Sequence, residues 1–357
     1  MEVIQVKGAP NLYLGYEGVL DELTILLDEH HFHQPVVIHG DASWKAAKTY
    51  ITLPEQTTYI NYHGDCTHEE VDRVRVLTTA AHTDVIIGVG GGKILDIAKG
   101  VGAKQGLPVI LIPTLASNCA AWTPLSVFYD TEGNFLEYIV FPQSTYMVLL
   151  EPRIIIDSPV AFLRAGIGDT IAKWYEADVL TRQLEPRPIT LEIALHAARL
   201  CRDVLLEEGN KAIEALNTKT MSVEFVRIIE TIIMAGGMVG SYGDQYGRIS
   251  GAHSIHNGLT YVSETHQHLH GDKVAFGVLV QLAIEDRLDE VEQLLPYYNA
   301  LELPTSLRAL GITENVANAI QIIAEGATKP GESIHLMGVS DPKQVAAAIR
   351  AIDNLKQ

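Results

Sequence analysis

The chain has 357 residues, of which 47% are hydrophobic and 20% charged, and its formal net charge is -18. This composition excludes a disordered chain, and the length predicts two domains. The negative charge argues against nucleic acid and against anionic membranes as partners. Three scattered cysteines without a CxxC pair, no signal-peptide pattern and no long apolar run together predict a cytoplasmic protein.

Short β-branched runs alternate with helical patterns as far as residue 158. We expect strands at residues 35–38, 58–61, 84–88, 108–112 and 146–150. Such alternation is typical of a parallel sheet with crossover helices. The run TDVIIGV is apolar at consecutive positions, which predicts a central strand covered by helices on both faces.

The pattern changes after residue 158, where amphipathic helices such as 188–206 and 222–239 replace the strands. We therefore expect two domains. Residues 1–158 form an α/β, Rossmann-like dinucleotide-binding domain, and residues 159–357 form an all-α domain that carries the metal and substrate sites.

A glycine turn, Gly90-Gly91-Gly92, joins the strand at 84–88 to a helix. Glycines leave room for a pyrophosphate, and the helix that follows offers free N–H groups and the positive end of its dipole. The alternative is a tight turn without a ligand. In that helix, Asp96 is either a surface charge or a hydrogen-bond acceptor for the cofactor.

A second loop, PTLASNCAAWTP at residues 113–124, follows the next strand along the chain. Ligands of open α/β sheets bind along the edge formed by the carboxyl ends of the strands. The hydroxyls of Thr114, Ser117 and Thr123 are candidates to contact a ribose or a phosphate. Alternatively, they bond only to their own backbone.

Histidines are concentrated in one window, where five of the fourteen lie between residues 253 and 270: His253, His256, His266, His268 and His270. Neutral imidazoles that converge with a carboxylate suit zinc or ferrous iron and leave a position open for a substrate oxygen. Asp169 is the main carboxylate candidate, although an acid near a helix N-terminus also serves as a cap. The spacing does not select the ligands, and solvated or core histidines remain the alternative.

Five segments occur in family order: GGGKILDIAKG, PTLASNCAAWTPLSVFYD, GIGDTIAKWYEA, AHSIHNGLT and HGDKVAFGVLVQL. Together they resemble the glycerol dehydrogenase-like branch of the iron-containing alcohol dehydrogenase superfamily. The resemblance implies a dehydroquinate synthase-like fold and a catalytic cleft between two domains. It also implies NAD or NADP, one divalent metal (zinc first, ferrous iron second), a small-molecule substrate and a homo-oligomer.

The same resemblance assigns residues to roles. It implies Asp169, His253 and His270 as metal ligands and His256 as a neighbour of the substrate. The implied cofactor contacts are Gly90, Gly91, Gly92, Lys93, Ile94, Asp96, Thr114, Leu115, Ala116, Ser117, Thr123, Leu125 and Tyr129. Asp41, one position after the usual ribose-binding acid, is expected to bind a ribose 2′-OH and to repel a 2′-phosphate. The choice between NAD and NADP stays open.

Two departures from the glycerol dehydrogenase pattern bear on the substrate. Cys119 stands where those enzymes have an aspartate, and Lys173 stands where they have a small neutral residue. Lys173 follows Asp169 by four residues and so lies on the same helical face. Losing an acid and gaining a cation both favour an anionic substrate, so Lys173, His256 and Cys119 are the candidate catalytic residues on the substrate side.

The amino-acid sequences of these segments also resemble the hydroxycarboxylate dehydrogenase branch of the superfamily. We therefore expect interconversion of a small 2-hydroxy acid and its 2-oxo acid. The alternatives are a glycerol or other small-alcohol dehydrogenase, a dehydroquinate synthase-like lyase, and a metal-binding protein without turnover. Arg248 is either a carboxylate clamp on an inward-facing helix or a surface arginine.

Overall fold

The computed structural model describes residues 4–355, which divide into two compact units. The first, here called the sheet unit, comprises residues 7–159 and 215–238. The second, the helical unit, comprises residues 160–214 and 239 onward, together with residues 4–6. The domain limits 1–158 and 159–357 stay a prediction.

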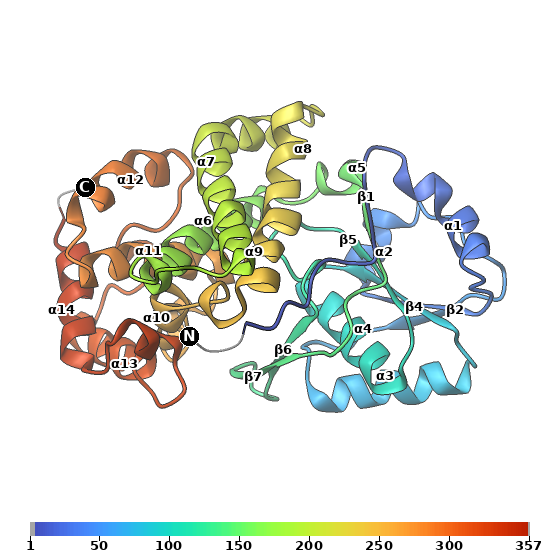
Figure 1. The fold of residues 1–357 in the computed structure, drawn as a ribbon, viewed down its shortest axis with the longest axis horizontal. Coiled ribbons are helices and arrows are strands. Elements are labelled where there is room, and N and C mark those ends of the chain that lie inside the picture. The colour runs from blue at the N-terminus through green and yellow to red at the C-terminus, as the bar shows by residue number, and fades with distance from the viewer. Residues whose placement is uncertain (1–3, 356–357) are drawn as a thin grey trace. The chain divides into compact units, whose positions relative to one another are not determined.

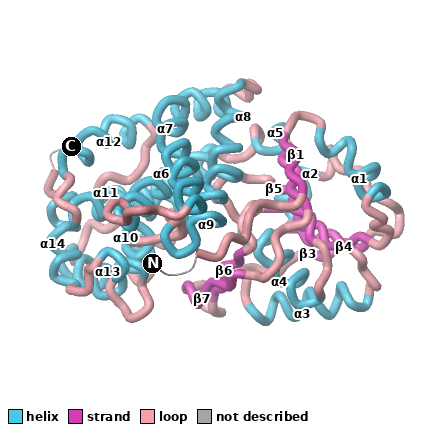
Figure 2. Tube along the Cα trace, viewed as in Figure 1, coloured by secondary structure: helices cyan, strands magenta, loops and turns pink. Residues whose placement is uncertain are grey.

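Six strands form one sheet in the sheet unit, in the order β1-β8-β5-β4-β2-β3. Every pair in this sheet is parallel, which confirms the predicted fold class, and Figure 2 marks its strands in magenta. The strands are β1 (Leu12–Gly15), β2 (Pro35–His39), β3 (Thr58–Asn61), β4 (Val85–Gly90), β5 (Val109–Pro113) and β8 (Met147–Leu150). A separate antiparallel pair consists of β6 (Leu125–Tyr129) and β7 (Phe135–Val140).

Helices cover both faces of this sheet, as Figure 1 shows for α1 (Leu23–Glu29), α2 (Asp41–Ala47), α3 (His68–Ala80) and α4 (Gly92–Gln105). All six residues of β4 are buried. Ile87 belongs to the core that includes α1 and Ala47 of α2. Gly88 points to the opposite face, where a Cβ atom would lie 2.8 Å from the Cβ of Ala98 in α4. Glycine at position 88 thus lets α4 pack closely on the strand, and the predicted two-sided cover is confirmed.

The order of the strands places a switch point between β2 and β4. From β2 the chain moves outward to β3, and it then returns beside β2 as β4 and continues the other way to β5 and β8. The carboxyl ends of two such neighbouring strands bound the crevice where open α/β sheets bind ligands. The glycine turn follows β4 and Asp41 follows β2, so both flank this crevice.

The predicted helix at 222–239 is divided in the structure. It consists of α8 (Val223–Glu230), a π-helical turn at Thr231–Ala235 and α9 (Gly236–Gly243). Gly237 packs against Trp122, because a Cβ atom there would lie 2.5 Å from the tryptophan Cβ. Residues 215–238 therefore belong to the sheet unit, to which α5 (Pro152–Ile155) also belongs.

The helical unit contains α6 (Val160–Thr181), α10 (Gly251–Leu259), α11 (His270–Ile284), α12 (Leu288–Ala300), α13 (Val316–Ala327) and α14 (Pro342–Asp353). It also contains helix α7 (Ile189–Asn217) as far as residue 214. Helix α11 packs against α6, α10, α12 and α14, so it is the central helix of this unit (Figure 1). No helix within residues 4–355 is long and apolar enough to cross a membrane.

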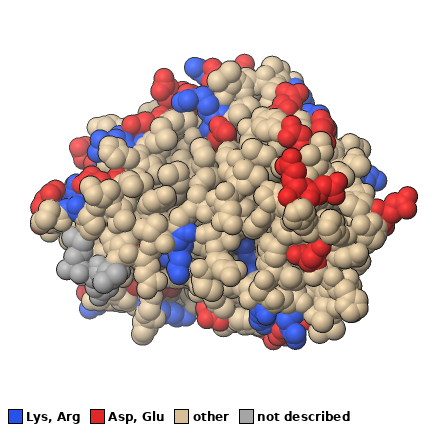
Figure 3. All heavy atoms as spheres, turned by 45° about the vertical axis from the view of Figure 1, so that its right-hand side comes forward, with Lys and Arg blue, Asp and Glu red and all other residues tan. Residues whose placement is uncertain are grey.

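Charged side chains are unevenly spread on the face drawn in Figure 3. Acidic side chains gather in the upper right of the view, whereas lysine and arginine side chains are scattered in small groups. The expected absence of nucleic-acid and membrane partners, like the cytoplasmic location, stays a prediction.

Candidate metal centre and cofactor loops

Glycines allow the helices of the helical unit to approach closely enough to form a site. A Cβ atom on Gly168 in α6 would lie 2.6 Å from the carbonyl oxygen of Gly271 in α11. A Cβ atom on Gly277 in α11 would collide with the backbone of Ala252 in α10. Asp169, His270 and His253 come directly next in sequence to Gly168, Gly271 and Ala252, the residues that make these contacts. The close crossings therefore bring the three side chains together.

Asp169, His253 and His270 offer three ligand atoms that lie within 4.8 Å of one another. The Nε2 atoms of His253 and His270 lie 3.3 Å and 3.2 Å from Oδ1 of Asp169. Two ligands held 2.0–2.1 Å from a tetrahedral ion lie about 3.3–3.4 Å apart. The N/N/O donor set and its spacing therefore fit one divalent metal.

Electrostatics in this cluster favour a cation. Burial alone would raise the pKa of the Asp169 carboxyl, but Lys173 and the two histidines hold it well below its usual range. Burial alone would lower the pKa of His253, but Glu176 and Asp169 raise it to about 9. The negative field that retains a proton on His253 would equally retain a metal ion.

Glu176 orients His253 and was not singled out in the sequence. Its Oε2 lies 2.8 Å from Nδ1 of His253, so this nitrogen donates its proton and leaves Nε2 facing Asp169. Its Oε1 accepts from the backbone N–H groups of Ser250 and His253 at 2.7 Å and 3.0 Å. Glu176 therefore also satisfies the free N–H groups at the start of α10. It follows Asp169 by seven residues, about two helical turns. This spacing is the sequence feature that could have identified Glu176.

His256 lies beside the metal candidates, and its predicted place next to the substrate stays a prediction. Its Nε2 is 2.9 Å from Nδ1 of His270, and its Nδ1 is 3.0 Å from Oδ1 of Asn257. Burial and the nearby cations hold the pKa of His256 well below its usual range, so its imidazole is neutral. Among those cations is Lys273, a buried lysine of α11 that sequence reasoning missed.

Lys173 is buried within this cluster, with 7% of its surface exposed. Its Nζ lies 3.4 Å from the carbonyl oxygen of Arg248. Its charge also lowers the pKa of Asp169 and of Glu176. The predicted cation beside the metal ligands is therefore present, and it partly offsets the two carboxylates.

Arg248 differs from both expectations stated for it. It follows a 3₁₀ turn at Asp244–Tyr246 rather than lying in a helix. Its Nη2 donates to Oδ1 of Asp244 at 2.7 Å, and its side chain is only 16% exposed. The guanidinium thus pairs within the protein; the expected helix and the surface position were wrong, and a role of Arg248 as a carboxylate clamp stays a prediction.

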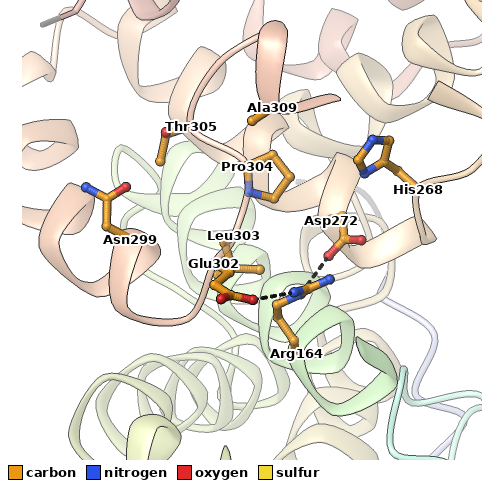
Figure 4. Close-up of a pocket in the computed structure, with 9 residues that line it drawn as sticks. All are labelled: Arg164, His268, Asp272, Asn299, Glu302, Leu303, Pro304, Thr305 and Ala309. Carbon is orange, nitrogen blue, oxygen red and sulfur yellow. Dashed lines mark hydrogen bonds and ion pairs between the residues drawn. The ribbon is translucent and has the colours of Figure 1, made fainter. Parts of the chain in front are cut away.

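The other two histidines of the window lie outside the cluster. His266 bonds through Nε2 to the carbonyl oxygen of Thr260 at 2.9 Å. His268 lines a cavity of about 270 Å³, in which Arg164 lies between Asp272 and Glu302 (Figure 4). Asp272 Oδ2 also accepts from the N–H of Leu269 at 3.3 Å, so this cavity adjoins the start of α11.

The glycine turn of the sheet unit is packed against the second loop. A Cβ atom on Gly91 would lie 3.0 Å from Leu115, and one on Gly92 would lie 2.8 Å from the amide of Asn118. The N–H of Thr114 donates to the carbonyl oxygen of Gly90 at 3.0 Å. The two predicted cofactor segments therefore lie side by side, at the N-terminus of α4, which has no side-chain cap.

Asp96 does not lie on the surface, which is a correction. Its carboxylate is buried, pairs with Lys99 at 2.9 Å and accepts from the N–H of Val127 at 3.0 Å. The ammonium of Lys99 also donates to the carbonyl oxygens of Ala120, Thr123 and Leu125. This geometry favours a structural role, in which Asp96 and Lys99 hold the second loop and β6 against α4.

The remaining predicted cofactor residues flank these loops. Lys93 forms an ion pair with Asp65 and lies 5.7 Å from the ring centre of Tyr129. The Cys119 carbonyl accepts from the N–H of Trp122 at 3.0 Å, which places Cys119 in a turn of the second loop. Contacts of the whole predicted set with a cofactor, and of Cys119 with a substrate, stay predictions.

The two units together carry the parts of a metal-dependent oxidoreductase, a parallel sheet with a glycine turn at its switch point and an N/N/O metal centre. Residues 10–152 match the model of the family described as iron-containing alcohol dehydrogenase. The chain is 37% identical over 358 residues to hydroxycarboxylate dehydrogenase A of Escherichia coli (strain K12), covering 99% of this chain and 98% of that protein.

Two further comparisons agree. Glycerol dehydrogenase of Pseudomonas putida is 40% identical over 304 residues, which cover 84% of this chain and 82% of that protein. The crystal structure of a probable glycerol dehydrogenase from Sinorhizobium meliloti 1021 is 31% identical, with a TM-score of 0.88 and 98% of each chain covered. The chain belongs to the iron-containing alcohol dehydrogenase family, in its glycerol dehydrogenase-like branch. It is a metal-dependent alcohol dehydrogenase, an oxidoreductase that acts on CH–OH groups, and this disfavours the lyase and the protein without turnover.

Proposed function

We propose that this dehydrogenase interconverts a small 2-hydroxy acid and its 2-oxo acid, using NAD or NADP and one divalent metal at Asp169, His253 and His270. The observation that carries the proposal is the buried ammonium of Lys173 beside the carboxylate of the metal centre. The similarity to hydroxycarboxylate dehydrogenase A supports it as well. A cytoplasmic homo-oligomer remains our expectation for its location and assembly.

The metal, the nicotinamide, Glu176 and Lys173 each have a separate chemical role in this proposal. When bound, the metal supplies a Lewis acid for the substrate oxygen and the nicotinamide supplies or accepts the hydride. Glu176 accepts the Nδ1 proton of His253, so that Nε2 would be the atom to bind the metal once its own proton is released. Lys173 would pair with the substrate carboxylate, because a charge-assisted contact in a buried position is stronger than one between neutral groups.

Cofactor choice depends on Asp41, the first residue of α2 at the switch point. Its Oδ1 accepts from the side-chain amide of Asn61 at 2.6 Å. We expect Asp41→Ser to raise kcat/KM with NADPH relative to NADH by roughly tenfold or more, because a 2′-phosphate would no longer meet a carboxylate. Initial rates with both cofactors measure the ratio. An unchanged ratio would contradict this role.

Glycerol dehydrogenase activity is the second candidate. Its support is the 40% identity to the enzyme of Pseudomonas putida and the structural match to the probable enzyme of Sinorhizobium meliloti. In that case the charge of Lys173 would serve only to offset Asp169 and Glu176. A neutral polyol would gain nothing from a cation in the site.

A substrate panel separates the two candidates. NADH and NADPH consumption is followed with 2-oxoglutarate, 2-oxobutanoate and dihydroxyacetone, with zinc or ferrous iron supplied. We expect the 2-oxo acids to give the higher kcat/KM. Turnover of dihydroxyacetone alone would reject the hydroxy-acid proposal and leave the family assignment intact.

A further inference from the structure

A chain of hydrogen bonds runs from Asp169 to a distant part of the helical unit. His270 bonds to Asp169 through Nε2 at 3.2 Å and to Nε2 of His256 through Nδ1 at 2.9 Å. His256 Nδ1 then lies 3.0 Å from Oδ1 of Asn257. Finally, Nδ2 of Asn257 lies 3.2 Å and 3.1 Å from the two carboxylate oxygens of Glu332. Glu332 precedes the 3₁₀ turn Ser333–Met337, 75 residues along the chain from Asn257.

Glu332 fixes the donor and acceptor at each step of this series of hydrogen bonds, because an ionised carboxylate only accepts hydrogen bonds. It receives the amide protons of Asn257, and the Ser254 hydroxyl bonds to it as well. Burial raises the pKa of Glu332, and these two donors oppose that shift by stabilising its ionised form. With its nitrogen turned to Glu332, Asn257 presents its oxygen to His256.

The two histidines then have only one compatible arrangement of protons. His256 must carry its proton on Nδ1 to donate to Asn257, so its Nε2 accepts. His270 must therefore donate from Nδ1, which in the neutral imidazole leaves the Nε2 lone pair for a metal. In the absence of a metal the 3.2 Å contact with the Asp169 carboxylate requires a proton on Nε2, which the metal would replace. In the reverse arrangement a lone pair on His256 Nδ1 would face the oxygen of Asn257, and a proton on His270 Nε2 would occupy the metal-binding direction.

The tautomer of His270 depends on more distant hydrogen-bond partners than the tautomer of His253 does. The Nδ1 of His253 bonds directly to the buried Glu176, and its side chain is 10% exposed. The His270 side chain is 42% exposed, and its Nδ1 partner is another imidazole, which can either donate or accept. When a metal takes the place of the proton between His270 Nε2 and Asp169, the direction of the hydrogen bond at His270 Nδ1 would be set at the far end of the series, by Asn257 and Glu332.

We propose that Glu332 and Asn257 are positioning residues that hold His270 in its metal-binding tautomer through His256. The inference rests on the metal centre of the proposed function. Partners of metal ligands typically contribute about 10–100-fold to metal affinity. Glu332 acts on His270 through the side chains of Asn257 and His256, and Asn257 acts through His256 alone.

The test is the Zn²⁺ affinity of the full chain, measured by competition with a chromophoric chelator. We expect Glu332→Ala to weaken Zn²⁺ binding about 10–100-fold, because Asn257 is then free to turn its nitrogen toward His256. Glu332→Gln, whose amide oxygen still accepts from Asn257, is the matched control and should bind within about threefold of the parent chain. Thermal unfolding of the metal-free proteins checks that each variant folds.

Asn257→Leu removes the acceptor beside His256 and should show the same loss, which keeps the test decisive if Glu332→Ala does not fold. Zn²⁺ affinity of Glu332→Ala within threefold of the parent would overturn the inference. Equal weakening by Glu332→Gln would also overturn it, since the charge rather than the direction of the bond would then matter. Failure of the parent chain to bind Zn²⁺ would reject the metal centre itself.

Discussion

Removal of the divalent metal is expected to lower the dehydrogenase activity by at least about a thousandfold, since a Lewis acid contributes several kcal/mol to the barrier and ~4 kcal/mol is about three powers of ten. Returning zinc or ferrous iron should restore turnover. It should also raise the temperature of unfolding, because a ligand at about 1,000 times its Kd adds ~4 kcal/mol to stability. Activity and thermal unfolding, before and after treatment with a chelator, measure both effects.

Asp169→Asn should abolish the shift in unfolding temperature on adding metal, because the carboxylate that both histidines face is lost. His266→Ala is the matched control. It removes a histidine from the same stretch of sequence, but one that bonds to Thr260 outside the cluster. A metal-dependent shift that survives in Asp169→Asn would show that the metal binds elsewhere.

Lys173→Met is expected to lower kcat/KM for 2-oxo acids by about 10–100-fold, which corresponds to the 1.5–3 kcal/mol of a charge-assisted hydrogen bond. Methionine keeps most of the length of the buried side chain and removes its charge together with its hydrogen-bond donors. The rate with dihydroxyacetone should change by less than about threefold, because a neutral substrate makes no ion pair. Initial rates at saturating metal give both values.

Saturating metal matters in this experiment because Lys173 also lowers the pKa of Asp169 and Glu176. Without the lysine, these carboxylates would bind a cation at least as well, so weaker metal binding cannot account for a selective loss with acids. Equal losses with the acid and with dihydroxyacetone would assign Lys173 to the metal centre. The glycerol dehydrogenase candidate would then be favoured.

Five of the six strands of the parallel sheet were predictable, because four of them are buried apolar runs and the fifth, β3, contains the β-branched residues Thr58 and Ile60. The sixth, β1, was missed because its four residues include no β-branched side chain, whereas the equally short edge strand β3 contains Thr58 and Ile60. Its short LYLG sequence has no pattern that separates it from a loop. The packing of residues 215–238 with the sheet unit likewise depends on contacts such as Gly237 with Trp122, which no local pattern reveals.

The candidate metal ligands came from the family resemblance, because the spacing of the histidines had left the choice open. Glu176 was within reach of sequence reasoning, since it repeats the helical face of Asp169 two turns later. Glu332 was not, because its pairing with Asn257 joins segments 75 residues apart. The burial of Asp96 was out of reach for a similar reason, since the N–H that it accepts from, that of Val127, lies 31 residues away.

The buried ammonium of Lys99 links two segments that would otherwise move independently. Two of its carbonyl acceptors, from Ala120 and Thr123, lie in the second loop and the third, from Leu125, begins β6, whereas Lys99 itself is anchored in the middle of α4. Opening that loop requires the ammonium to lose these acceptors while it stays buried, which is costly in free energy. We therefore expect the loop and α4 to open as one cooperative unit, so that slow amide exchange in the helix extends into a segment without regular secondary structure.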